Sequence, residues 1–119
     1  MDIEFFRAYC LAKKGVVACF PFDDKTLVFK VLDKMFALTN LERFPFGVNL
    51  KCDPKKALEL RELYPESIFP GYHMNKKHWN TIYFEAHHTD EFLKKAIDES
   101  YRLVVATFTK KRQQELAAM

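Results

Sequence analysis

Residues 26–39 read TLVFKVLDKMFALT, and this stretch decides the fold class. β-Branched and aromatic side chains are frequent in it, and Asp33-Lys34 is the one pair of adjacent charged residues that interrupts the apolar run. Two such runs joined by a short polar break predict two antiparallel strands in a tight hairpin. Because neither turn residue is glycine, a strict two-residue turn would be slightly strained, and a longer loop stays open as the alternative.

A third strand and a second hairpin are predicted further along the chain. Residues 47–52, GVNLKC, alternate apolar and polar side chains, which is typical of a half-buried strand. Residues 78–85, HWNTIYFE, also alternate between two faces. A short strand at 72–74 could pair with this segment through a turn at 75–77.

Three helices are predicted around these strands. Asp53 and Thr89 are the expected N-caps of two of them, and Pro65 ends the helix that begins after Asp53. The last eleven residues, 109–119, either extend the third helix or fray. The predicted helices cover residues 3–13, 54–64 and 89–108.

The resulting order of elements is typical of an α+β protein in which helices cover one face of an antiparallel sheet. A chain of 119 residues has the commonest size of one domain, so residues 1–119 are expected to form a single domain. We also expect a monomer.

The charge balance limits the choice of partner. Nineteen Lys and Arg against sixteen Asp and Glu give a net charge of +3, so a nucleic-acid surface would require local clustering of the cations. The first ten residues mix Asp2, Glu4 and Arg7 with apolar residues, unlike a signal peptide. Since no apolar run approaches the roughly 20 residues that span a bilayer, we expect a cytoplasmic protein without membrane contact.

Motifs that carry enzyme chemistry are absent from the sequence. It contains no G-x-S-x-G, P-loop or G-x-G-x-x-G pattern, and its three cysteines show no C-x-x-C spacing. We therefore expect no enzymatic activity, no cofactor and free thiols. A metal site is not expected either, because His87 and His88 would point to opposite faces of an extended segment, and His73 and His78 lack a supporting carboxylate or cysteine.

The densest polar chemistry lies at residues 72–79, YHMNKKHW, on the predicted second hairpin. Cations there could contact phosphates while an aromatic ring stacks on a base. The alternative is a solvated turn with Trp79 in the core. If Lys30 and Lys51 share a face with Lys76, they would form a positive groove.

Four stretches of the chain carry a family resemblance: CLAKKG at 10–15, FKVLDKMFAL at 29–38, NLKCDP at 49–54 and YPESIFPGYHMNKKHWNTIYF at 64–84. In these stretches the sequence resembles the MmcQ/YjbR family, and the H-M-N-K-x-H-W segment is the specific part. The resemblance extends over almost the whole chain.

This resemblance implies a CyaY/frataxin-like fold and a double-wing mode of DNA binding, in which hairpins grip the duplex. One departure concerns the first hairpin turn, where family members commonly have glycine and this chain has Leu32-Asp33. The residues expected at the nucleic-acid site are Lys30, Lys34, Lys51, His73, Asn75, Lys76, Lys77 and Trp79.

Three hypotheses follow for function. The first is DNA binding of low sequence selectivity, with lysines on phosphates and Trp79 or Tyr72 as an aromatic contact. The second is a small-ligand or protein-interaction module built around the motif from His73 to Trp79, which predicts a concave site around Trp79 with a buried His73. The third is an enzyme that uses His73 as acid or base, for which the sequence supplies no nucleophile.

Overall fold

The computed structural model describes residues 1–72 and 74–119 of the chain, and a six-stranded antiparallel sheet runs through its centre. The strand order is β1-β2-β3-β4-β6-β5, so only β5 and β6 are out of sequence order. The strands are β1 (Val16–Cys19), β2 (Thr26–Val31), β3 (Lys34–Asn40), β4 (Gly47–Lys51), β5 (Ile68–Pro70) and β6 (Trp79–Tyr83). The helices are α1 (Ile3–Leu11), α2 (Pro54–Leu63), α3 (Asp90–Val105) and α4 (Lys110–Ala117).

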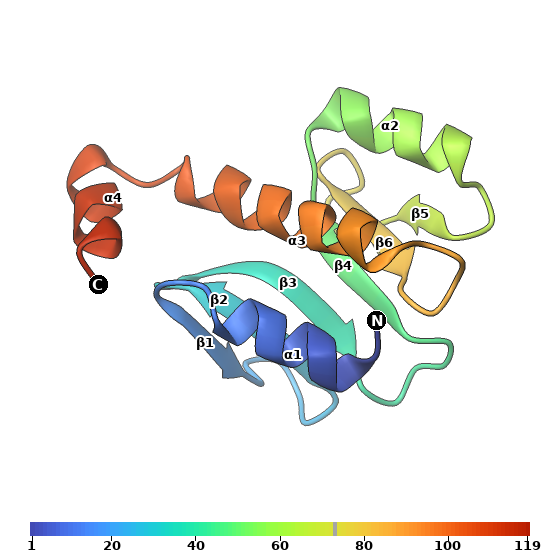
Figure 1. The fold of residues 1–119 in the computed structure, drawn as a ribbon, viewed down its shortest axis with the longest axis horizontal. Coiled ribbons are helices and arrows are strands. Elements are labelled where there is room, and N and C mark those ends of the chain that lie inside the picture. The colour runs from blue at the N-terminus through green and yellow to red at the C-terminus, as the bar shows by residue number, and fades with distance from the viewer. Residues whose placement is uncertain (73) are drawn as a thin grey trace.

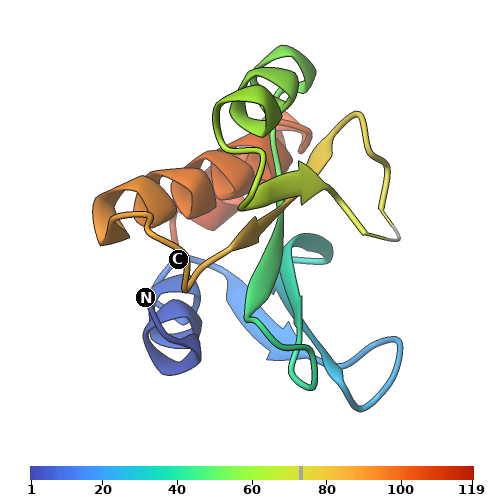
Figure 2. The ribbon, with the colours of Figure 1, turned by 90° about the vertical axis from the view of Figure 1, so that its right-hand side faces the viewer.

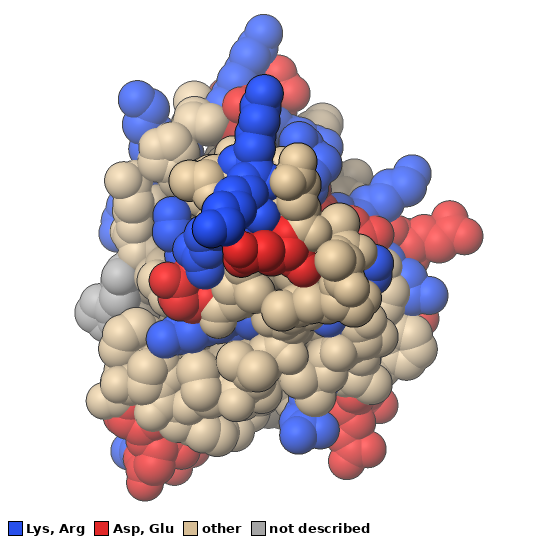
Figure 3. Space-filling view, turned by 90° about the vertical axis from the view of Figure 1, so that its left-hand side faces the viewer, with Lys and Arg blue, Asp and Glu red and all other residues tan. Residues whose placement is uncertain are grey.

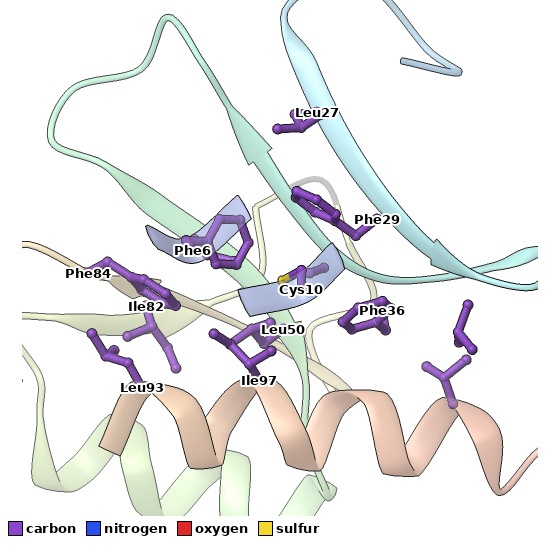
Figure 4. Packing of buried hydrophobic residues seen from close by; sticks show 14 of the residues in the cluster. Phe6, Cys10, Leu27, Phe29, Phe36, Leu50, Ile82, Phe84, Leu93 and Ile97 are labelled. Carbon is purple, nitrogen blue, oxygen red and sulfur yellow. The ribbon is translucent and has the colours of Figure 1, made fainter. Parts of the chain in front are cut away.

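Helices α1, α2 and α3 lie on the same side of this sheet (Figures 1 and 2). The main core fills the space between the helices and the sheet (Figure 4). At its centre the Phe6 ring of α1 makes edge-to-face contacts with Phe29 of β2 and Phe84, at centroid distances of 5.3 and 5.4 Å. Leu93 and Ile97 close the core from α3. The predicted α+β class, with helices covering one face of an antiparallel sheet, is therefore confirmed.

The predicted hairpin of residues 26–39 is also confirmed, with a small change at its turn. Strand β2 ends at Val31 and β3 begins at Lys34, so Leu32 and Asp33 form the turn. Leu32 has φ +56°, in the left-handed region that glycine adopts more easily. The turn is therefore a tight one, built without the expected glycine.

Four details differ from the sequence prediction. Strand β1 was not predicted, and the partner of β6 at the sheet edge is β5 and not residues 72–74. The first helix ends at Leu11, two residues early. The last segment neither extends α3 nor frays, because Thr109 caps a separate helix, α4. No helix in the described part of the chain is long and apolar enough to cross a membrane.

Candidate functional site

The sheet face opposite the helices carries a groove of about 830 Å³. Leu38, Asn49 and Thr81, on the adjacent strands β3, β4 and β6, contribute to its lining. Two connections project from this face: residues 20–25, in light blue, and residues 71–72 and 74–78, in yellow, which are called the 71–78 connection (Figure 2). Phe22 of the first connection and Tyr72 of the second also line the groove, so the groove lies between them.

Two predicted lysines, Lys30 and Lys51, lie on strands next to the groove but outside its lining, and Lys51 also lines a second cavity with residues of α2 and α3. Lys30 pairs with Met35, and Lys51 pairs with Trp79. Met35 and Trp79 both belong to the small apolar cluster on the uncovered face, so alternation puts Lys30 and Lys51 on that face too. The predicted positive groove required Lys76 on the same face as these two lysines, and it stays a prediction.

A hydrogen-bond network at the centre of the groove holds the backbone of Tyr72. The Thr81 hydroxyl donates to Asn49 Oδ1 and accepts from the Tyr72 amide at 3.2 Å. The Asn49 side-chain amide donates to the Tyr72 carbonyl at 3.4 Å. The backbone amide and carbonyl of Tyr72 are thus both hydrogen-bonded to side chains of the strands beneath the groove.

Arg43, in the connection between β3 and β4, is a groove residue that the sequence reasoning missed. Its guanidinium carbon lies 4.3 Å from the centroid of the Tyr72 ring, which is the geometry of a cation–π contact. Tyr72 is 52% exposed, so the pair presents a planar, positively charged surface to the groove. A lone arginine in a loop gives no sequence signal for this contact.

Two carboxylates also line the groove, and both have partners. Asp23 accepts hydrogen bonds from the backbone amides of Lys25 and Thr26 at 2.9 and 2.7 Å, and these bonds hold the pKa of its carboxyl below the usual value. Glu42 lies 3.4 Å from the Lys25 ammonium. Both carboxylates of the groove therefore already interact with donors of neighbouring residues.

Arg61 of α2 fixes the base of the 71–78 connection. Its Nε donates to Asn80 Oδ1 at 2.7 Å, and its Nη2 donates to the carbonyls of Trp79, at 3.3 Å, and Lys76. Asn80 is buried, and its amide also donates to the carbonyl of Ala57. One side chain from the helical layer therefore positions one wall of the groove, a role that helix periodicity could not indicate.

The residues predicted on the second hairpin are divided between surface and core. Asn75, Lys76 and Lys77 are exposed, and Asn75 accepts a hydrogen bond from the amide of Lys77 in a local turn. Trp79 is only 8% exposed and packs on Val28 and Leu38, so its ring is covered. Of the two rings considered for stacking, Tyr72 belongs to an exposed residue and Trp79 to a buried one. The prediction for His73 falls outside the described residues.

Lys34 lies away from the groove, contrary to its predicted place in the site. Its ammonium is 3.2 Å from the Thr107 hydroxyl and 5.6 Å from the centroid of the Phe108 ring, near the junction of α3 and α4. At the end of the molecule that carries α4, Lys and Arg side chains gather with Asp and Glu among them (Figure 3). One such pair joins Arg112 to Asp33 at 2.9 Å.

The histidines do not approach a metal geometry in the described part of the chain, where no three metal-ligating side chains come together. His87 and His88 stack with ring centroids 5.6 Å apart, instead of pointing to opposite faces as predicted. His88 also stacks on Phe92, and its Nε2 lies 2.8 Å from the Ser67 hydroxyl. The cysteines are free, and burial raises the pKa of Cys10 to about 12.

Comparison with known proteins places the chain in a family. The YjbR family model matches residues 11–103. Escherichia coli O157:H7 YbdF is 42% identical over 95% of this chain and 92% of its own, and Escherichia coli K12 YjbR is 31% identical over the full length of both; both are described as uncharacterized proteins.

Solved structures show the same architecture. The crystal structure of Deinococcus radiodurans protein DR2400, with a DUF419 domain, is 42% identical and covers 97% of this chain and 87% of its own with a TM-score of 0.91. A Pseudomonas syringae protein is 25% identical with a TM-score of 0.73, over 87% of this chain and 98% of its own. The resemblance found in the sequence is thus confirmed, and the chain belongs to the YjbR family.

Proposed function

We propose that this protein binds DNA with low sequence selectivity through the groove on the uncovered sheet face. The observation that carries the proposal is the combination of Lys30 and Lys51 on one face with the stacked pair of Arg43 and Tyr72. Cations that reach phosphates supply affinity independent of sequence, and an aromatic ring supplies contact with any base.

The position of Lys76 and Lys77 supports the proposal that this face binds DNA. Lys76 and Lys77 are exposed on the connection that forms one wall of the groove. Arg61 holds the base of this connection through three hydrogen bonds, so the two lysines project from a fixed support. The net charge is +3, and the groove lining itself holds Arg43 with the carboxylates Asp23 and Glu42, so the proposal relies on the lysines around the groove.

A second candidate is a module that binds a small ligand or a peptide. The groove itself favours it, because Met35, Leu38 and Met74 give an adaptable apolar lining within a concave site of ligand size. Leu38 lines the groove and packs in the same small apolar cluster as Trp79, although Trp79 itself does not line the groove.

The test is fluorescence anisotropy of labelled DNA of about 15 bases, as a single strand and as a duplex, at several salt concentrations. We expect binding of at least one form that weakens steeply as salt rises, because phosphate contacts release counterions. The double variant Lys30→Ala/Lys51→Ala should bind more weakly and reduce the slope of log affinity against log salt by up to about two.

The matched control is Lys110→Ala/Lys111→Ala, which removes the same charge from exposed positions of α4. It should bind like the unmodified protein. Equal losses in the two double variants would mean that net charge alone attracts DNA, which contradicts a specific face. If neither form of DNA binds at low salt, the DNA proposal fails and the ligand or peptide module takes its place.

A further inference from the structure

We infer that a second cavity, between α2, α3 and the sheet, binds a small aromatic carboxylate. The cavity lies on the side of the sheet that the helices cover, so this inference goes beyond the proposed DNA binding and does not depend on it. Three features of the cavity carry it: its size, its apolar interior and the lysines at its mouth.

The cavity exists because the two helices pack on different parts of the sheet. Helix α2 packs on β5 and β6, whereas α3 packs on β2, β3 and β4, and a space remains between them over β4 and β6 (Figures 1 and 2). The volume of this space is about 130 Å³. An engineered apolar cavity of about 150 Å³ takes up benzene, so the space suits one six-membered ring and little more.

The interior of the cavity is apolar. Leu50 of β4 and Ile82 of β6, each 2% exposed, form its floor. Leu60 of α2 lines one wall, and Phe92 and Ala96 of α3 line the other. These three wall residues are only half-buried, so a ring between them would cover apolar surface that now faces water.

The polar groups inside the cavity already have partners. The buried Asn80 side chain donates to the Ala57 carbonyl at 3.3 Å and accepts from Arg61 Nε at 2.7 Å. Burial holds the pKa of Cys52 above its usual value, so its thiol is neutral and acts as a small apolar group. In the described part of the chain, no buried side-chain nitrogen or oxygen lacks a hydrogen-bond partner. The inner end of a ligand therefore meets no polar group that requires a bond.

The mouth of the cavity favours a negative charge. Lys56 of α2 and Lys95 of α3 line the cavity from opposite walls, and both are exposed. Among the residues that the structure describes, neither ammonium forms an ion pair. Glu99 also lines the cavity, but it accepts a hydrogen bond from Arg102 Nε at 3.0 Å, and this bond, with a smaller effect of Lys56, holds its pKa below the usual value. The carboxylate of a ligand can therefore lie between the two lysines while its ring fills the interior.

The test uses three ring compounds of similar shape and different charge: benzoate, neutral benzyl alcohol and cationic benzamidine. Each is titrated into the isotope-labelled full chain while the backbone amides are followed by NMR. Benzoate should shift the amide signals of Leu60, Phe92 and Ala96 in a saturable way, benzyl alcohol should bind more weakly and benzamidine most weakly. Any other order of affinities overturns the assignment to a carboxylate, and no saturable shift of these signals with benzoate overturns the site.

The lysines are tested with the double variant Lys56→Gln/Lys95→Gln. It should weaken benzoate binding by about 4- to 25-fold, because one solvent-exposed ion pair contributes about two- to fivefold. The matched control is Lys55→Gln/Lys111→Gln, which removes the same charge from exposed positions outside the cavity and should bind like the unmodified protein. Lys51 is left unaltered, because it also belongs to the face proposed for DNA. Equal losses in the two double variants, or no loss in the first, overturn the role of the mouth.

Filling the cavity is the second test. Ala96→Leu should abolish the benzoate shifts without lowering the unfolding midpoint, because an added side chain that fills a cavity commonly stabilises a fold. Benzoate binding retained in this variant would place the ligand elsewhere, and a lowered midpoint would mean that the space is too small for a ring; both results overturn the site. DNA binding of Ala96→Leu should equal that of the unmodified protein, so the failure of one proposal is distinguished from the failure of the other.

Discussion

Single side chains from the helical layer determine the shape of the groove. Arg61 is the clearest case, because it joins α2 to Lys76 of the 71–78 connection and to Trp79 and Asn80 at the start of β6. Asn80 depends on it, since the buried amide oxygen of Asn80 receives its hydrogen bond from Arg61. Buried acceptors that lose their donor carry the full cost of desolvation.

Replacing Arg61 should therefore destabilise the protein and loosen the groove together. We expect Arg61→Ala to lower the free energy of unfolding by about 1–3 kcal/mol, because Asn80 Oδ1 is left without its donor. Urea denaturation measures this change. Arg102→Ala is the control, because its pair with Glu99 lies at the surface within α3 and contributes little. Equal effects of the two variants would contradict the positioning role of Arg61.

His88 makes stability depend on pH. Burial, with a smaller contribution from the charge of His87, holds the pKa of His88 below its usual value of 6.5. The folded state therefore prefers the neutral ring, so this contribution to stability is complete above pH 6.5 and decreases as the pH falls toward the lowered pKa. The ring stacks on Phe92, and Ser67 Oγ lies 2.8 Å away.

His88→Gln should remove this part of the pH dependence, because glutamine does not titrate. Thermal unfolding measured at neutral pH and at about pH 5 should show a larger drop in unfolding temperature for the unmodified protein than for this variant. Only the unmodified protein has an imidazole at position 88 that must take up a proton as the pH falls. His87→Gln, at an exposed position, should retain most of the dependence. The same pH dependence in His88→Gln and in the unmodified protein would show that His88 is not its source.

Among the elements, α4 is the one whose contribution the sequence least revealed. Its residues lie beyond the segment that the family model matches, yet Leu116 is 4% exposed and belongs to the main core. Lys14 also donates from its ammonium to the carbonyl of Ala117 at 2.9 Å. The helix is therefore a packed part of the fold.

Shortening the buried side chain of α4 tests this packing. Leu116→Ala should lower the free energy of unfolding by about 2–3 kcal/mol, because a large-to-small change in a core loses apolar contact and leaves a cavity. Leu63→Ala is the matched control, since Leu63 is 70% exposed and its loss should cost no more than about 0.5 kcal/mol. A similar, small effect of both changes would mean that α4 is only loosely attached.

Elements with strong local signals were predictable from the sequence, and weak ones were not. The hairpin of β2 and β3 and the capped helices α2 and α3 combine clear periodicity with turn or capping residues. Strand β1 has four residues and β5 has three, one of them proline, so neither offers a pattern long enough to detect.

The groove was partly predictable. The sequence indicated that Lys30 and Lys51 lie on or beside neighbouring strands, but their common face could be stated only as a condition, because it depends on how the strands pair. The burial of Trp79 and the contact of Arg43 with Tyr72 depend on which strands and loops meet in three dimensions, and no spacing in the sequence encodes that. Family members commonly have glycine at the first hairpin turn, whereas this chain has Leu32, which adopts the left-handed conformation in the hairpin.

At the scale of the whole molecule, the fold divides the sheet into two faces with different tasks. One face packs α1 and α3 over an aromatic and aliphatic core, and the other bears the groove between two projecting connections (Figures 2 and 4). We propose that packing on the first face stabilises the fold and that the second face binds the ligand. Substitutions on the groove face should therefore change affinity more than unfolding free energy, whereas core substitutions should do the reverse.

The most direct measurement is to titrate the isotope-labelled protein with DNA of about 15 bases, as a single strand and as a duplex, and to follow each backbone amide by NMR. We predict that the amide signals of Asn49, Thr81 and Tyr72 shift, together with those of neighbouring residues on the uncovered face. The amide signals of α1 and α3, which lie on the other side of the sheet, should not shift. Shifts confined to the helical side, or an unchanged spectrum at low salt, would contradict the assignment of binding to the groove.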